Sequence, residues 1–230
     1  MFKTVIRVDP GKGLEIDRLS FLSDGVFAIV LTLLVLELKI PEGLAPNRIL
    51  PALVDNAPKF AAFVIAFGAA SVGWAYSYLA HSVMRRSNFS HMILTLISLM
   101  MVSTIPFVSA VMGNYPDSPW GYVPYCFAIA ALCTALTLDM VINGRVLSDP
   151  ALDRRIITAF AGSTGLVMLI GLVGCGLAFW SPRLVFWVIV VVSALIWVDY
   201  FYLSAWIGRE LARVERGYEG DAAKSQTADP

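Results

Sequence analysis

An acidic residue lies inside the first apolar run of the chain. Asp24 follows Ser23 and is flanked on both sides by the apolar residues of the stretch 19–40. A carboxylate at such a depth costs about 2.5–3.5 kcal/mol on membrane-insertion scales, so we expect it to have a partner. Arg18 is the nearest cation, about one and two-thirds turns earlier on a helix. The alternative is that Ser23 or Asp24 caps the helix while Arg18 extends to the lipid headgroups.

The same run carries a stripe of side chains at helical spacing. Thr32 is the one polar residue in the apolar run that follows Asp24, and it shares a face with Ile29, Leu33 and Leu36 at positions i, i+3, i+4 and i+7. The stripe covers about 10 Å of depth. Several copies around an axis would form a hydrophobic constriction with one ring of hydroxyls, which gates by dewetting. The ordinary alternative is that the stripe faces lipid or packs against another helix.

Six apolar stretches are long enough to hold these residues in a bilayer. Of the 230 residues, 58% are hydrophobic and 15% charged, and the mean hydropathy of +0.73 makes a disordered chain untenable. A bilayer core roughly 30 Å thick needs about 20 apolar residues in a helix. The sequence therefore predicts an all-α integral membrane protein with transmembrane helices at 19–40, 60–83, 92–113, 121–142, 156–180 and 184–207.

The positions of the basic residues predict the orientation. All but four of the 17 Lys and Arg residues fall on the side of the N-terminus, which places both termini in the cytoplasm. We expect a cytoplasmic segment at 1–17, a six-helix transmembrane domain at 18–208 and a cytoplasmic tail at 209–230, disordered after Gly217. The 17 Lys and Arg balance 17 Asp and Glu, so no basic field indicates a nucleic-acid partner.

Other residues that could do chemistry are scattered. Asp199, inside the last span, could relay protons in a transporter, or could bond a Tyr or Ser of a neighbouring helix. Asp139 lies close to the cytoplasmic end of the fourth span, where we expect a solvated position. His91 lies at a helix start, so no histidine is placed to act as the base of an intramembrane enzyme. The three cysteines lie singly in apolar runs and predict neither a disulfide nor a metal site.

The first span resembles that of a known family. The stretch from Arg18 to Ile29 is similar to the first-helix signature of the TMEM175 family of potassium-permeable channels, which reads Arg-x-x-x-Phe-Ser-Asp followed by Gly-Val-Phe-Ala-Ile. Leu22 stands where the signature has phenylalanine. Tyr78-Leu-Ala-His81 resembles the end of the family's second helix, and Pro106-Phe107 a pair in its third. The resemblance covers roughly residues 18–125.

The resemblance implies roles for particular residues. It implies a polar network among four of them, Arg18, Ser23, Asp24 and His81. It implies an ion path lined by Ile29, Thr32 and Leu36 in a homotetramer, with potassium passing Thr32. A pairing of His81 with Asp24 would let protonation of the histidine tune the pore between about pH 5 and 8.

The implied activity is passive conduction of potassium through the plasma membrane, which in prokaryotes is the inner membrane. The chain has no Thr-Val-Gly-Tyr-Gly loop, the carbonyl filter of ordinary potassium channels, so we expect a modest preference for potassium over sodium. No cofactor is expected besides the permeant ion, and the expected partners are other copies of the chain and membrane lipid. A proton-coupled secondary transporter that uses intramembrane carboxylates is the alternative function.

Overall fold

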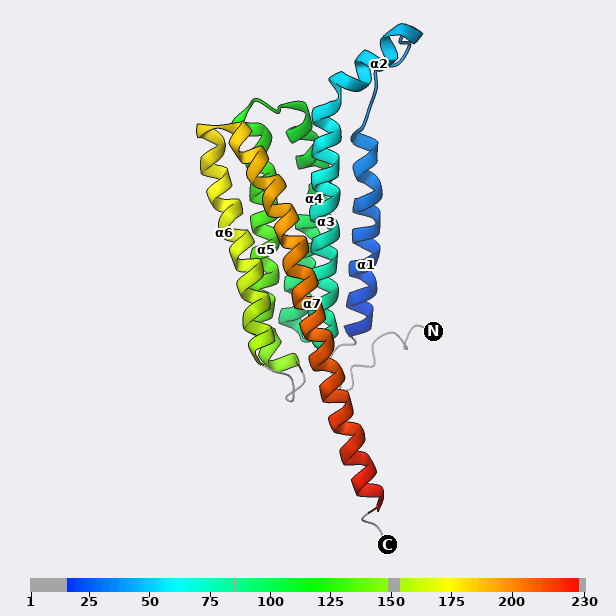
Figure 1. The fold of residues 1–230 in the computed structure, drawn as a ribbon, viewed down its shortest axis with the longest axis vertical. Coiled ribbons are helices and arrows are strands. Elements are labelled where there is room, and N and C mark those ends of the chain that lie inside the picture. The colour runs from blue at the N-terminus through cyan, green and yellow to red at the C-terminus, as the bar shows by residue number, and fades with distance from the viewer. Residues whose placement is uncertain (1–15, 85, 149–153, 228–230) are drawn as a thin grey trace, which may run out of the picture.

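Six long helices run side by side in one bundle (Figure 1). The computed structural model describes residues 16–84, 86–148 and 154–227, and side chains as far as Gly217. The predicted segment 1–17 lies outside these residues except for its last two. Each of the six helices is long and apolar enough to cross a membrane, as the sequence predicts. They are α1 (Ile16–Leu33) with its continuation η1 (Leu34–Glu37), α3 (Ala57–Val83), α4 (Phe89–Asn114), α5 (Pro119–Leu147), α6 (Arg154–Trp180) and α7 (Pro182–Thr227).

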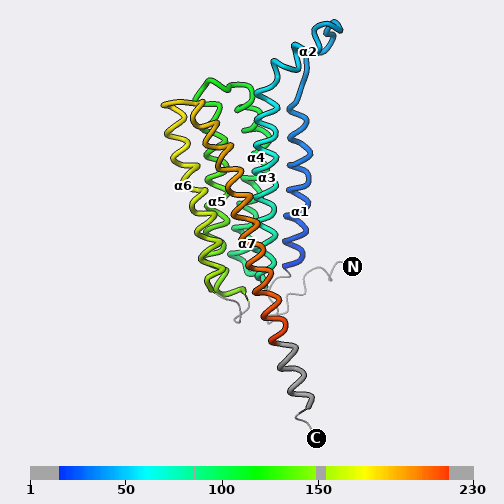
Figure 2. The backbone as a smooth tube through the Cα atoms, viewed as in Figure 1, coloured from blue at the N-terminus to red at the C-terminus, as the bar shows by residue number. Residues whose placement is uncertain are grey.

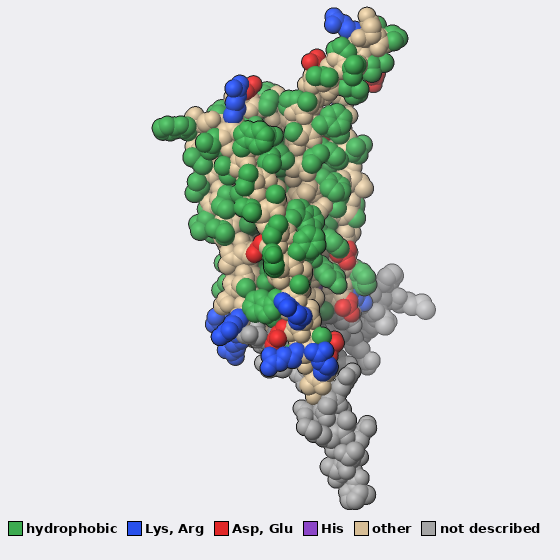
Figure 3. Space-filling view, in the orientation of Figure 1, with side chains coloured by type: hydrophobic (Ala, Val, Ile, Leu, Met, Phe, Trp, Pro, Cys, Tyr) green, Lys and Arg blue, Asp and Glu red, His purple; other side chains and the backbone are tan. Residues whose placement is uncertain are grey.

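The charges identify the two ends of the bundle. α1 begins, and α7 emerges, at the same end (Figures 1 and 2). Lys and Arg side chains gather at that end (Figure 3), and by the bias of basic residues toward the cytoplasm it is the cytoplasmic end. The basic residues on the opposite side of the six spans are Lys39, Arg48, Lys59 and Arg183.

The structure differs from the sequence prediction outside the membrane core. The outer connection at 41–58 contains a helix, α2 (Pro46–Asp55), whose first residue is a proline and which has no buried residue. The prediction of a disordered tail after Gly217 is wrong, because α7 continues as a helix to Thr227. A helix already formed in the membrane extends at little cost, since only its nucleation is unfavourable. The last three residues of the predicted tail lie outside the described part.

The helices differ in how deeply they are packed. Half of the most apolar window of α3 and of α5 is buried, against 11% of that of α7. α5 packs most extensively on α6, where a Cβ atom added at Gly171 would lie 3.0 Å from the Cys126 carbonyl oxygen. Small residues in membrane helices allow such close backbone approach. α3 and α5 therefore form the interior of the subunit, and α7 lies on its periphery.

Candidate functional site

The first helix has one buried and one exposed face. α1 packs against α3 and α4 through four buried residues, Leu19, Ser23, Phe27 and Val30. Phe27 is only 2% exposed, and its ring lies 3.4 Å from the place where Gly73 of α3 would carry a Cβ atom. The absence of a side chain at Gly73 therefore lets the ring of Phe27 seat α1 on the bundle.

The predicted stripe lies on the exposed face. Ile29 is 59% exposed and Leu36 60%, and Thr32 and Leu33 are exposed as well. The Thr32 hydroxyl donates a hydrogen bond to the Ile29 carbonyl oxygen at 2.8 Å, which occupies its proton and leaves its oxygen free to accept. In a single subunit these residues thus form part of the surface, and either lipid or another copy of the chain must cover them.

The stripe is not one continuous α-helix. The sequence predicts a helix to residue 40, but α1 ends at Leu33 and the backbone tightens into the 3₁₀ turn η1. Side chains three residues apart eclipse in a 3₁₀ turn, and the rise per residue is about 2.0 Å. Leu36 therefore lies about 1.5 Å farther along the helix axis than a straight α-helix would place it, and the stripe from Ile29 to Leu36 spans about 12 Å.

Asp24 has a partner that the sequence analysis missed. The Trp74 indole Nε1 donates a hydrogen bond to the Asp24 carboxylate at 2.8 Å, linking α3 to α1. The Ser23 hydroxyl donates to the Leu19 carbonyl oxygen at 2.9 Å within its own helix. The signal for Trp74 was its spacing: it lies seven residues before His81, so the two share one face of α3.

His81 belongs to a buried polar cluster at the cytoplasmic end. Its ring meets that of His91 edge to face, with 5.4 Å between ring centroids. The His91 Nδ1 lies 2.8 and 2.9 Å from the two carboxylate oxygens of Asp139, and Asn143 Nδ2 donates to the same carboxylate at 2.8 Å. We name His81, His91, Asp139 and Asn143 the buried histidine cluster. Asn88 completes it by accepting from the His91 backbone N–H and donating to Asn143.

This cluster corrects the prediction for Asp139. The residue is 5% exposed rather than solvated, and His91, although in the first turn of α4, is fully buried. A carboxylate inside a membrane protein is expected to be paired, and here the partner lies 48 positions away in the sequence. The sequence shows the two residues but gives no sign that α4 and α5 bring them together.

The four residues of the predicted polar network lie at the same end of the bundle. Asp24 is bonded to Trp74. The side chain of Arg18 is exposed in the first turn of α1. His81 and His91 connect α3 to α4 next to the place where α1 packs on the bundle. A direct network of Arg18, Ser23, Asp24 and His81 stays a prediction.

Asp199 is exposed on the surface of α7 but is hydrogen-bonded to two neighbouring helices. The Tyr76 hydroxyl of α3 and the Ser163 hydroxyl of α6 both bond to its Oδ2. This confirms the second of the two interpretations of Asp199, a bond to a Tyr or Ser of a neighbouring helix. The contact ties three helices together and occupies the carboxylate that a proton relay would need.

Comparisons with known proteins show what this chain is similar to. Residues 18–106 match the family described as "Endosomal/lysosomal potassium channel TMEM175". A protein of Streptomyces collinus named a potassium channel is 28% identical over 176 residues, which are 74% of this chain and 85% of that protein. A potassium channel of Chamaesiphon minutus is 29% identical, over 63% of this chain and 75% of its own.

A more distant human protein and a solved crystal structure are also similar to this chain. The human protein named endosomal/lysosomal proton channel TMEM175 is 24% identical over 64% of this chain and 30% of its own length. The crystal structure of a lysosomal potassium-selective channel TMEM175 homolog from Chamaesiphon minutus matches with a TM-score of 0.73 and 25% identity, covering 81% of this chain and 98% of that one. These relatives are channels rather than enzymes. Over its first three membrane helices and in its fold, the chain is similar to members of the TMEM175 family.

Proposed function

We propose that this chain is one subunit of a potassium-permeable cation channel whose ion path is lined by the α1 helices of several copies. The observation that carries the proposal is the two-sided packing of α1, with Phe27 buried and Ile29, Thr32 and Leu36 exposed. One α1 helix cannot enclose a path, so an assembly around a shared axis is required. A homotetramer is the assembly that the family resemblance implies.

The stripe would act as a hydrophobic gate. Rings of Ile29 and Leu36 give an ion nothing to replace its water, and the cost of dehydrating it closes the path when the ring is narrow. Between them, the Thr32 hydroxyl has its proton engaged by the Ile29 carbonyl, so the oxygen is available to a passing cation. Selectivity in this arrangement comes from a narrow, hydrated pore, and we expect a modest preference for potassium over sodium.

The other functions weighed from the sequence have less support. A proton-coupled transporter needs a carboxylate that exchanges protons with water, whereas Asp199 is bonded to two hydroxyls and Asp139 to His91. The relatives named potassium channels support passive conduction. We further propose that the channel works in the plasma membrane without enzymatic activity and without a cofactor beyond the permeant ion.

Reconstituted currents test the proposal. The purified chain in vesicles is expected to pass potassium down its gradient in single-channel events, with a reversal potential in mixed potassium and sodium that favours potassium. Ile29→Asn and Leu36→Asn hydrate the constriction and should raise the current. Each reduction of about 1.4 kcal/mol in the free-energy barrier to ion passage raises the current tenfold. Thr32→Ala removes the hydroxyl ring and should lower the preference for potassium.

The matched control places the same substitution on the periphery. Leu195 lies on α7 and is 62% exposed, so Leu195→Asn adds the same amide to a surface that the proposal assigns to lipid. If Ile29→Asn and Leu36→Asn change the current no more than Leu195→Asn does, the stripe does not line the path. Cross-linking in membranes should give a species of four 25.1 kDa chains, and a monomer that conducts would contradict the shared axis.

A further inference from the structure

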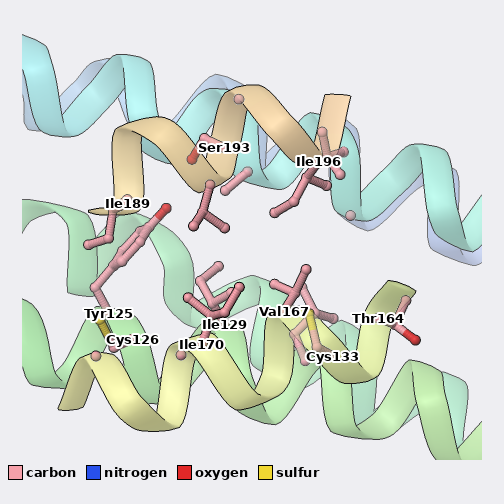
Figure 4. Close-up of a pocket in the computed structure, with 18 of the residues that line it drawn as sticks. Tyr125, Cys126, Ile129, Cys133, Thr164, Val167, Ile170, Ile189, Ser193 and Ile196 are labelled. Atoms are coloured by element: carbon pink, nitrogen blue, oxygen red, sulfur yellow. The ribbon is translucent and has the colours of Figure 1, made fainter. Parts of the chain in front are cut away.

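An apolar cavity lies inside the subunit, away from the α1 stripe. It has a volume of about 90 Å³ and is lined by residues of α3, α5, α6 and α7. Figure 4 shows side chains of α5 and α6 facing those of α7 across it, among them Ile129, Val167, Ile189 and Ser193. No Lys, Arg, Asp or Glu is among the described residues that line it. Its occupant must therefore be neutral and largely apolar.

The seventh helix covers the cavity loosely. α7 is anchored by the buried side chains of Val185 at one end and of Leu203 and Ile207 at the other. Between Val185 and Leu203 no side chain of α7 is fully buried. The stretch over the cavity is thus only partly packed: Ile189 and Ile196 contact the core but also line the cavity, and molecules from the surrounding lipid can reach it there.

One polar group in this wall has no partner. Tyr125 is 2% exposed, and its hydroxyl makes no hydrogen bond to any described residue. In Figure 4 the Tyr125 side chain extends from α5 to the side of Ile189 on α7, at one end of the cavity. A buried hydroxyl in a hydrocarbon environment is expected to be bonded. A water there would need two to four polar partners, and the labelled neighbours Cys126 and Ile189 offer no strong one.

The shape of the cavity limits the ligand further. The lining residues of α5 run from Tyr125 to Leu136, which is about 16 Å along the helix. At the far end, Tyr76 and Ser163 also line the cavity, but their hydroxyls are engaged by Asp199. The cavity is thus elongated and largely apolar, with the Ser193 hydroxyl on its α7 side and, at one end, the buried Tyr125 hydroxyl, which has no partner among the described residues.

We propose that this cavity is a binding site for a neutral, chain-shaped apolar molecule from the membrane, bearing a single oxygen that accepts the hydrogen bond of the Tyr125 hydroxyl. A long-chain alcohol or ester has this chemistry. The site is separate from the α1 stripe, and its occupancy is measured without ion flux, so its test does not depend on the channel proposal.

Photolabelling tests the site directly. The full chain in phosphatidylcholine vesicles is irradiated with 3-azioctanol, an eight-carbon alcohol with a diazirine group, and adducts are located by peptide mass spectrometry. Adducts are expected on the lining residues of α5, α6 and α7, and excess 1-octanol should suppress them. Tyr125→Phe keeps the ring and removes the hydroxyl. Losing one hydrogen bond should raise the probe concentration for half-maximal labelling by about 2- to 10-fold.

A pair of variants separates the cavity from general partitioning into lipid. Val167→Phe fills the cavity and should abolish the adducts, whereas Leu169→Phe adds the same ring to the exposed face of α6 and should leave them unchanged. Adducts that persist in Val167→Phe, or that map only to outward residues such as Leu169, overturn the site. Equal labelling of wild type and Tyr125→Phe overturns the role of the hydroxyl, and this comparison stands even if Val167→Phe does not fold.

Discussion

Replacing Asp139 by leucine removes the acceptor at the centre of the buried histidine cluster. An ionised carboxylate only accepts hydrogen bonds, so the His91 Nδ1 and the Asn143 amide are its two donors. Leucine fills a similar volume but accepts nothing. Because His91 and Asn143 are both fully buried, neither donor can turn to water: the His91 Nδ1 is left unbonded, and the Asn143 amide keeps only its 3.4 Å contact to the Ser90 hydroxyl.

The size of the effect follows from these two lost bonds. A buried donor that loses its short hydrogen bond costs about 1–3 kcal/mol, so two of them lower the free energy of unfolding by about 4 kcal/mol. For a chain of this size each kcal/mol corresponds to about 2–4 °C in the midpoint of thermal unfolding. Asp139→Leu is therefore expected to lower the midpoint by about 8–16 °C.

Thermal unfolding of the purified chain in a mild detergent, followed by tryptophan fluorescence, measures this shift. Asp139→Asn keeps one acceptor oxygen and should fall between wild type and Asp139→Leu. The control is Asp117→Asn, since Asp117 lies 3.7 Å from Arg183 with both side chains exposed, and such surface pairs contribute little. An Asp139→Leu midpoint equal to that of Asp117→Asn would refute the assignment of a stabilising role to the cluster.

Two further substitutions probe the attachment of α1 and the packing of α6. Trp74→Phe keeps an aromatic ring but removes the hydrogen-bond donor to Asp24. Because a hydrogen bond to a charged group contributes about 1.5–3 kcal/mol, α1 should detach more often and protease cleavage at α1 should become faster. An unchanged cleavage rate would contradict the contact. Gly171→Ala puts a methyl group 3.0 Å from the Cys126 carbonyl oxygen and should lower the midpoint of thermal unfolding. Gly162 lies in the same helix with open space around it. Gly162→Ala should therefore raise the midpoint slightly, because alanine favours the helix by about 0.5–1 kcal/mol. Equal shifts for the two glycines would show that α5 and α6 are not in close contact.

The sequence alone determined the six membrane helices and the composition of the stripe. An apolar run of about 20 residues has few alternatives to an α-helix in a bilayer, because every backbone polar group must be hydrogen-bonded inside the segment. The periodicity of the helix then places Ile29, Thr32 and Leu36 on one edge. Both results depend on local geometry, which is why they could be derived without knowing how the helices pack.

Only the tertiary structure decided which edge of α1 is covered. Both Phe27 and Ile29 are apolar, and in lipid an apolar side chain is equally at home on the outside and the inside, so hydropathy does not encode burial. Phe27 is buried because α3 offers the gap at Gly73, a residue 46 positions away. The exposed edge is what remains after this packing.

The polar contacts were also beyond the sequence. Asp139 and His91, or Asp24 and Trp74, are 48 and 50 positions apart, and spacing along the chain carries no information about contacts between helices that can pack in several orders. The orientation of α3, α4 and α5 brought these donors and carboxylates together. The same packing left the buried Tyr125 hydroxyl without a partner among the described residues, because its neighbours at that end of the cavity, such as Ile189, are apolar.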